Sequence, residues 1–309
     1  MFIVDSHCDS IQKVDVEGST LINEYNFSKK NCQLQFVAMM AERSTDKGND
    51  SYHRTLRYTN KYQSAISNES ANILPVKCYK DVEIAFKLKK HASILCIESA
   101  TGLNNSPKLL EEFYNYGVRV VGLTWLSNKL AKSNRVFDDG EEDTGISDIG
   151  KEFVKKGNEL GIIWDVSHLS DKSFWDLTEL SKKPIIATHS NFRALCNHSR
   201  NLTDDMANFI IKNGGMIGLN LATKFIHEDD EKQTVNNLFK HLDYCLELGG
   251  ENSIGLGLDI DGITKYPKPL TLDTSIHDQI INLLLKNYSE KLTEKVVGLN
   301  YLNYLKKWL

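Results

Sequence analysis

Three histidines and three carboxylates fall at comparable places in the sequence, at the ends of short apolar runs. They are His7 in VDSHCD, Asp9, Glu98 in IES, His168 in WDVSH, His189 in IIATHS and Asp259 in GLDIDG. Neutral imidazoles and carboxylates are the ligands that zinc and related divalent metals bind. These six side chains could therefore hold cations, provided that the fold brings them together.

Each of these residues also has a plain structural explanation when it is taken by itself. His7 and Asp9 are two apart, so on a strand both point to the same side and can grip one cation, but an HxD pair often arises by chance. His168 or His189 could simply be a buried histidine that hydrogen bonds a loop, and Glu98 could be a solvated strand end. Five such residues on four different strand ends are harder to explain by packing or solvation, and this favours a metal site.

The chemistry that fits this set is metal-assisted hydrolysis. Glu98 is the candidate bridge between two ions, which at a separation of about 3.5 to 4 Å would clamp a water and lower its pKa from about 15.7 to about 7. Asp259 could take the proton of that nucleophile and return it to the leaving group. Asp261 is the competitor for this role, and Asp259 is preferred because Asp261 comes later, in the turn with Gly262.

The elements that must position these residues are read from the alternation of apolar runs with amphipathic segments, which is typical of parallel βαβ units. Eight runs are predicted to be strands. They begin at Phe2, Leu34, Ser93, Arg119, Gly161, Pro184, Gly214 and Ser253. Eight strands close a (β/α)8 TIM barrel, whose active site lies at the carboxyl ends of the strands. The predicted metal ligands fall at that face.

Helices are predicted between the strands at residues 106–117, 148–161, 170–183 and 203–215. Several begin with Ser, Thr or Asp and end on Gly, which satisfies the free groups at helix ends. Residues 273–309 are expected to form the last helix and a tail. The polar segment 10–32 is expected to be a loop or small hairpin. With no linker or repeat, residues 1–309 are predicted to form a single domain.

Composition limits the partners of the chain. Its 309 residues are 41% hydrophobic and 25% charged with a net charge of −4, and no basic stripe is available for nucleic acid or an anionic bilayer. No signal peptide, lipid anchor or apolar run of about 18 residues is recognised, so a cytoplasmic protein is expected. The six cysteines are dispersed without a CxxC pair, which fits a reducing compartment and disfavours thiolate zinc.

Taken in order, the motifs resemble the membrane dipeptidases, the renal-dipeptidase-like zinc peptidases of the amidohydrolase superfamily. The resemblance runs through DSHCD, IES, RVVGLTW, DVSH, THS, RN and GLDIDG to EKVVGLNYLNYLKK. It implies that His7 and Asp9 bind one zinc, that His168 and His189 bind the other, and that Glu98 bridges them. It also assigns the acid and base role to Asp259, and it suggests a soluble bacterial-type member and a homodimer.

Three substrate-binding residues follow from the resemblance. Arg200 matches the family's arginine that holds the substrate carboxylate, and Asn201 follows it. The fork of a guanidinium group suits a free C-terminal carboxylate, which would explain a preference for dipeptides. Trp125 stands in LTW where the best-known members have LTH, with a histidine that helps to stabilise the oxyanion. An indole donates one hydrogen bond but cannot become a cation, so oxyanion stabilisation would rest more heavily on the metals.

The expected function is hydrolysis of small dipeptides through a bridging hydroxide on a binuclear zinc site. Manganese or cobalt would be accepted by the same ligands. A second hypothesis keeps the site but changes the substrate to an N-acyl amino acid, a β-lactam or a lactone. A third is a metal-bound barrel without catalytic activity, which only Trp125 favours.

Overall fold

The structure is a computed structural model that describes residues 1–12, 33–67 and 72–309. Within these residues, eight parallel strands form a ring in which each pairs with its neighbour, and pairing of β2 with β4 closes it. The strands are β1 (Val4–Cys8), β2 (Leu34–Met39), β4 (His91–Ile97), β5 (Val118–Gly122), β6 (Ile163–Asp165), β7 (Ile186–Ala187), β8 (Met216–Leu219) and β9 (Ile254–Leu256). Each overlaps one of the eight predicted runs, so the predicted (β/α)8 barrel is confirmed.

A ninth strand, β3 (Ile73–Pro75), was not predicted from the sequence. It pairs in parallel with the start of β4, from His91 to Ser93, and it belongs to the crossover between β2 and β4. Its three residues end on a proline, which has no N–H to donate and is typical of a sheet edge. A run this short has no readable alternation, so the period-2 pattern could not reveal it.

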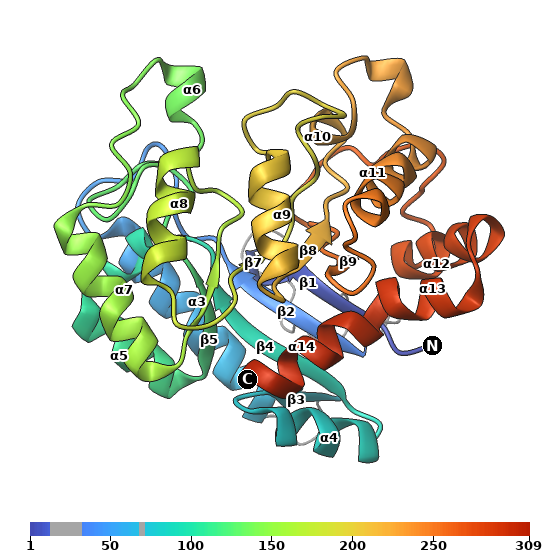
Figure 1. Cartoon of the computed structure of the whole chain (residues 1–309). Helices are drawn as coiled ribbons and strands as arrows, with labels where there is room; N and C mark the ends of the chain where they lie inside the picture. The colour runs from blue at the N-terminus through green and yellow to red at the C-terminus, as the bar shows by residue number, and fades with distance from the viewer. Residues whose placement is uncertain (13–32, 68–71) are drawn as a thin grey trace.

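Helices surround the strands, as Figure 1 shows. They are α3 (Asp50–Ser67), α4 (Tyr79–Lys87), α5 (Pro107–Tyr116), α6 (Val136–Asp139), α7 (Asp148–Leu160), α8 (Asp171–Leu180), α9 (Asp204–Lys212), α10 (Thr223–Ile226), α11 (Val235–Glu247), α12 (Ile276–Asn287), α13 (Glu290–Glu294) and α14 (Asn300–Trp308), with short turns η2 (Ala100–Leu103), η3 (Asp230–Lys232) and the π-helical η4 (Lys295–Leu299). None of the helices in the described ranges has the length and apolarity needed to cross a bilayer.

The predicted starts of α5, α7, α8 and α9 are confirmed, and the predicted glycine end is confirmed in α5 and α7, whereas the C-cap residues of α8 and α9 are Ser181 and Asn213. Each has a side-chain oxygen that accepts a hydrogen bond from a backbone N–H in the first turn, and the N-cap residues are Ser106, Ser147, Ser170 and Thr203. Gly117 and Gly161 end α5 and α7 at φ of +117° and +81°, a left-handed conformation that glycine adopts without strain. Local sequence signals therefore predict where these four crossover helices begin and where α5 and α7 end.

The C-terminal segment 273–309 is helical, as predicted, and α14 closes the amino-terminal end of the barrel. Tyr301 and Leu305 share a buried apolar cluster with Val4, Leu34 and Ala92, which lie in one register row near the starts of their strands. A side chain at Gly255 of β9 would collide with the Tyr301 ring. Of the predicted loop or hairpin 10–32, residues 13–32 lie outside the described residues.

A buried histidine on α11 ties together two of the loops at the other end of the barrel. The backbone N–H of Phe192 donates to Nδ1 of His241 at 3.2 Å, and Nε2 lies 3.0 Å from the carbonyl of Ile226. Both contacts require the neutral imidazole with its proton on Nε2. Burial lowers the pKa of His241 to about 4, although the hydrogen bond to Ile226 opposes this shift.

The free energy of unfolding is expected to decrease as the pH is lowered, because the His241 imidazole takes up a proton more readily in the unfolded chain than in the folded protein. Between pH 6.5 and 4 that chain binds a proton which the folded protein excludes, so His241 should contribute about 2 kcal/mol less to the unfolding free energy at pH 4.5 than at pH 7. Urea unfolding at both pH values should show a smaller loss in His241→Gln. The exposed His53→Gln variant serves as control; equal losses in all three proteins would refute the assignment.

Candidate metal centre

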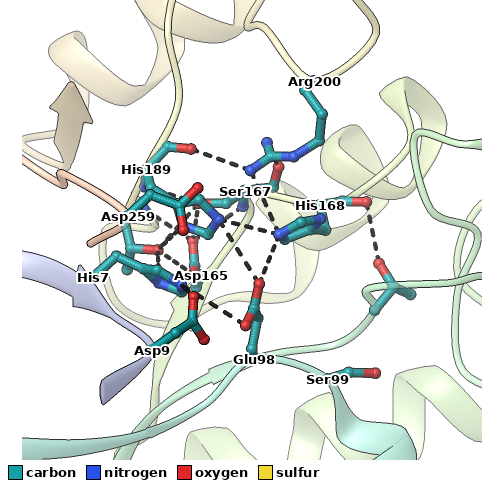
Figure 2. A network of polar contacts seen from close by, with 12 residues as sticks. His7, Asp9, Glu98, Ser99, Asp165, Ser167, His168, His189, Arg200 and Asp259 are labelled. Carbon is teal, nitrogen blue, oxygen red and sulfur yellow. Dashed lines mark hydrogen bonds and ion pairs between the residues drawn. The ribbon is translucent and has the colours of Figure 1, made fainter. Parts of the chain in front are cut away.

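The predicted site residues meet at the carboxyl ends of the barrel strands. His7 lies next to the last residue of β1 and Asp9 directly follows that strand, Glu98 follows β4, and His168 and His189 lie in the turns after β6 and β7. All five are buried or nearly so. Figure 2 shows them converging from different strands together with Asp259 and Arg200. The placement that sequence position predicted is thus the placement found.

A cavity of about 260 Å³ opens above this cluster. Its lining consists of Asp9, Gln12, Met40, Glu98, Trp125, His168, His189, Arg200, Ala222, Phe225, Asp259, Asp261, Gly262 and Ile263. His7 lies just beneath it, with 2% of its surface exposed. A cavity of this size admits a small molecule, with charged groups at its base and apolar side chains such as Met40 and Phe225 on its walls.

Glu98 is the centre of the cluster. Its Oε2 lies 3.7 Å from Nε2 of His7, and its Oε1 lies 2.9 Å from Nε2 of His168 and 3.9 Å from Nε2 of His189. The two oxygens of one carboxylate therefore face different imidazoles. This is the arrangement that a bridging carboxylate needs.

The remaining distances suit cation ligands. Nε2 of His7 is 3.6 Å from Oδ2 of Asp9, and Nε2 of His168 is 3.1 Å from Nε2 of His189. Ligand atoms about 2.0 to 2.2 Å from a tetrahedral zinc lie roughly 3.3 Å from one another. Two sets of ligand atoms lie within 4.8 Å of one another, His7 with Glu98 and His189, and His7 with Asp9 and Asp259.

Two buried polar atoms support a cation at this place. Nε2 of His7 and Oε2 of Glu98 have no hydrogen-bond partner among the described residues, although neither is exposed to water. An unsatisfied buried nitrogen and a carboxylate oxygen each carry a desolvation cost. Both are metal-ligand atoms, and a divalent cation between them would remove that cost, so the residues present fit a metal.

The electrostatics of the imidazoles point the same way. Burial disfavours a charged His7, but the carboxylates of Glu98 and Asp9 outweigh it and raise the pKa of His7 to about 10. Burial, together with the charges of His7 and Arg200, lowers the pKa of His168 and of His189 well below the usual range. Two histidines are thus neutral, as metal ligands must be, and the site draws a positive charge to the third, which a cation would replace.

The pKa values of two carboxyl groups in the cluster are raised, because both groups are buried and lie close to other carboxylates. Burial and the neighbouring Asp9 raise the pKa of Glu98 well above its usual range. Burial likewise raises the pKa of Asp259 to about 6, while His7, Arg200 and the Asn220 amide partly oppose this. Oδ2 of Asp259 accepts a hydrogen bond from Nδ2 of Asn220 at 3.2 Å. Buried like charges of this kind are typical of sites that bind cations or move protons.

Asp259 and Asp261 are both in left-handed backbone conformations, at φ of +58° and +72°. Asp259 belongs to a ligand set with His7 and Asp9, whereas Oδ2 of Asp261 lies 3.8 Å from the Cys8 thiol. The two side chains therefore face different neighbours. This supports Asp259 over Asp261 as the residue nearest the cation positions.

Gly262 allows these carboxylates to approach one another. A Cβ at this position would collide with Oδ2 of Asp9 and with Oδ1 of Asp259. Gly262→Ala is therefore expected to push both carboxylates aside and to lower metal affinity by about 10-fold or more, by analogy with the loss of groups that orient metal ligands. The melting temperature should change little, because only side-chain ends must move. Isothermal titration with zinc would measure the effect, and unaltered binding in the alanine variant would refute this reading.

Arg200 lies beside the imidazoles and is buried. Its guanidinium donates to the backbone carbonyls of Ser167 and His189, the latter at 3.2 Å, and Nη2 is 3.4 Å from Nε2 of His168. Its Cζ lies 5.2 Å from the ring centre of Phe225. These contacts hold the positively charged guanidinium of Arg200 at the cavity wall.

Trp125 and Asn201 are placed differently by the structure. Trp125 lines the cavity with its ring 6.4 Å from that of His168, so it occupies a position where substrate can meet it. Asn201 does not line the cavity. Its amide donates to the carbonyls of Cys196 and Phe225, both at 2.9 Å, and thereby ties the loop of Arg200 to α10.

Sequence reasoning missed a set of buried polar residues beneath the ligands. Thr188 contacts the side chain of His189, and the Ser167 hydroxyl accepts a hydrogen bond from the backbone N–H of His189. Asp165 accepts hydrogen bonds from the hydroxyls of Thr188 and Ser167, and Asn220 contacts Asp259. Asp165 and Thr188 are the first residues of the DVSH and THS motifs. Their polar side chains inside buried strand ends were the available signal.

Fold and site together define a metal-dependent hydrolase of the (β/α)8 type. A sequence profile of the membrane dipeptidase family, peptidase family M19, matches residues 1–308. The chain belongs to this family, and it is a metallo-dipeptidase, a hydrolase that acts on peptide bonds.

Individual relatives agree with this assignment. An uncharacterized protein of Klebsiella pneumoniae, from the pqqA 5′ region, is 33% identical over 232 residues, which are 73% of this chain and 85% of that protein. An uncharacterized dipeptidase of Schizosaccharomyces pombe is 31% identical over 236 residues, 75% of this chain and 56% of that protein.

Solved structures share the fold across the whole chain. The crystal structure of dipeptidase AC, a metallopeptidase of family M19, superposes with a TM-score of 0.86 at 21% identity, and the match covers 100% of this chain and 98% of that one. A metallopeptidase from Rhodobacter sphaeroides, liganded with a phosphinate mimic of the dipeptide L-Ala-D-Ala, gives 0.85 at 21% identity, with 100% and 99% covered.

Proposed function

We propose that this chain hydrolyses dipeptides with a free C-terminal carboxylate, using two divalent ions, zinc being the expected metal. The observation that carries the proposal is the position of Glu98, whose two oxygens face His7 on one side and His168 with His189 on the other. His7 and Asp9 would hold one ion, and His168 and His189 the other. When bound, such ions polarise the scissile carbonyl and lower the pKa of water towards neutrality.

The protein's own residues would supply the remaining steps. The Asp259 carboxylate, with its pKa raised to about 6 by burial, would take the proton from the attacking water and return it to the nitrogen of the leaving amine. Burial of the site would exclude bulk water and strengthen its electrostatic interactions.

Arg200 would bind the carboxylate of the substrate's second residue. Its charge lies at the cavity wall next to His168, within reach of a small ligand placed on the imidazole cluster. Trp125 would bound the same cavity as an apolar wall with one N–H to donate. Since the Asn201 amide donates to the backbone carbonyls of Cys196 and Phe225, its contribution to substrate binding would be indirect, through the loop of Arg200.

The test is hydrolysis of a panel of L,L- and L,D-dipeptides by the protein as purified, after thorough chelation, and after zinc or manganese is restored. Hydrolysis should disappear with the metal and return with about two ions per chain. Activity that survives in protein shown to be metal-free would overturn the proposal. An N-acetyl amino acid and a lactone in the same panel would reveal the alternative substrate classes.

Carboxylate recognition is tested separately with Arg200→Ala. The variant should raise KM for dipeptides about 10- to 100-fold, the size expected for losing a charged hydrogen bond, and should affect dipeptide amides less. Arg193→Ala controls for distortion of the loop, because Arg193 pairs with Asp171 at 2.7 Å and donates to the backbone carbonyls of Ser199 and Asn201 on either side of Arg200. A preferential loss for dipeptides over their amides should appear in Arg200→Ala and not in Arg193→Ala. Equal losses for dipeptides and their amides would contradict the role of Arg200.

A further inference from the structure

One buried hydroxyl contacts two of the candidate metal ligands. Oγ1 of Thr188 lies 2.8 Å from Nδ1 of His189 and 3.4 Å from Nδ1 of His7. The rings of His7 and His189 are stacked, with centroids 3.7 Å apart, so both can present Nδ1 to the same oxygen. Thr188 is itself buried, with 1% exposed, in the turn that follows β7.

The proton of this hydroxyl has a defined acceptor. Oγ1 of Thr188 donates to Oδ2 of Asp165 at 2.5 Å. The other oxygen of Asp165, Oδ1, accepts from the N–H and hydroxyl of Ser167, at 3.0 and 2.6 Å, and from the N–H of Thr188 at 3.0 Å. Because every one of these contacts comes from a donor, Asp165 acts only as an acceptor.

The direction of the other contacts follows from this. A threonine hydroxyl has one proton and two lone pairs. With the proton directed to Asp165, both lone pairs must accept, so Nδ1 of His7 and Nδ1 of His189 each carry a hydrogen. The neighbouring Ser167 hydroxyl, 3.2 Å from Oγ1, cannot compete because its own proton goes to Asp165.

A neutral imidazole with its hydrogen on Nδ1 has its lone pair on Nε2. In both histidines Nε2 is the atom that faces Glu98, at 3.7 Å for His7 and 3.9 Å for His189. Since His7 and His189 are assigned to different cations, one hydroxyl sets the ligand atom for both positions.

The backbone of Thr188 is also held firmly in the barrel. Its carbonyl accepts a hydrogen bond from the Ser6 hydroxyl at 2.6 Å. Any side chain at Gly218 of β8, or at Gly257 just after β9, would collide with the same carbonyl. The backbone of Thr188 therefore cannot shift without disturbing β1, β8 or the residues after β9.

We propose that Thr188 is a positioning residue shared by the two cation positions, which orients His7 and His189 so that Nε2 of each faces a metal. Asp165 completes the arrangement by taking the hydroxyl proton. This inference rests on the proposed metal centre but goes beyond it, since it predicts that a single hydroxyl couples the affinities of both ions.

The first test needs no metal. Long-range ¹H–¹⁵N correlation spectra of the metal-free protein should show His189 with its hydrogen on Nδ1. Thr188→Val, which keeps the volume but removes the hydroxyl, should lose this preference, and Thr188→Ser should retain it. The control is Thr59→Val, since Thr59 on α3 is equally buried. Its hydroxyl contacts the carbonyl of Thr55 and the sulfur of Met39, not a histidine. His189 with its hydrogen on Nε2 in the wild type would overturn the inference.

The second test measures zinc binding by competition with a chelator. Thr188→Val should weaken both binding steps about 10- to 100-fold, the usual effect of removing a group that orients a metal ligand, and Thr188→Ser should restore them to within a few-fold. Weakening of only one step, or equal affinity in Thr188→Val and the wild type, would refute the shared role. If the wild type binds no zinc at all, the proposed metal centre itself fails, while the spectra still decide the orientation of His189.

Discussion

Replacing Glu98 with glutamine is expected to reduce dipeptide hydrolysis by about 10³-fold or more and to leave fewer than two ions bound per chain. The change keeps the shape of the side chain but removes its charge and turns one oxygen into an N–H donor. That group would face either His7, 3.7 Å from Oε2, or His168, 2.9 Å from Oε1. The charge that stabilises both cations and the developing transition state would be lost together.

Glu42→Gln is the matched control for this variant. Glu42 is also buried close to the site, but its Oε2 accepts from the Ser99 hydroxyl at 2.7 Å and from the N–H of Leu126 at 3.2 Å. An amide oxygen can accept both bonds, so activity and metal content should stay close to those of the wild type. Metal analysis with steady-state kinetics provides the comparison. A Glu98→Gln enzyme with two ions and a nearly normal rate would exclude the bridging role.

The positions of the candidate ligands could be predicted because a parallel barrel converts sequence position into spatial position. Each strand ends at the same face, so a histidine or acid at the end of an apolar run is already placed to within a few ångströms. His168 and His189 are 21 residues apart in sequence, yet their Nε2 atoms are 3.1 Å apart. No side-chain detail was needed for that prediction.

The residues that orient the ligands could not be predicted in this way. The role of Thr188 depends on where its single proton goes, and that depends on Asp165 lying on the neighbouring strand at 2.5 Å. Asn201 is a second example: its place after Arg200 predicted substrate binding, and only the coordinates show that its amide donates to the carbonyls of Cys196 and Phe225. Strand order gives the neighbourhood of a side chain, whereas hydrogen-bond direction requires coordinates.

Asp259→Asn is expected to lower kcat by about 10²- to 10⁴-fold, the usual range for loss of a general acid or base, with a smaller change in KM. An asparagine keeps the volume and can remain next to Asn220, but it cannot accept the proton of the attacking water. Asp259 also shares a ligand set with His7 and Asp9, so rates must be measured at saturating zinc with the metal content determined.

Asp261→Asn provides the decisive comparison, because Asp261 has the same charge, also lines the cavity and shares the left-handed backbone conformation. Its carboxylate lies near the Cys8 thiol and outside the ligand set of His7 and Asp9, so its replacement should change kcat by less than about 10-fold. If Asp261→Asn loses more activity than Asp259→Asn at equal metal content, the proton must pass through Asp261. The positive φ at both positions makes each turn sensitive to backbone change, but asparagine is among the residues that adopt this conformation most readily. A difference between the two variants can therefore be attributed to the carboxylate and not to the turn.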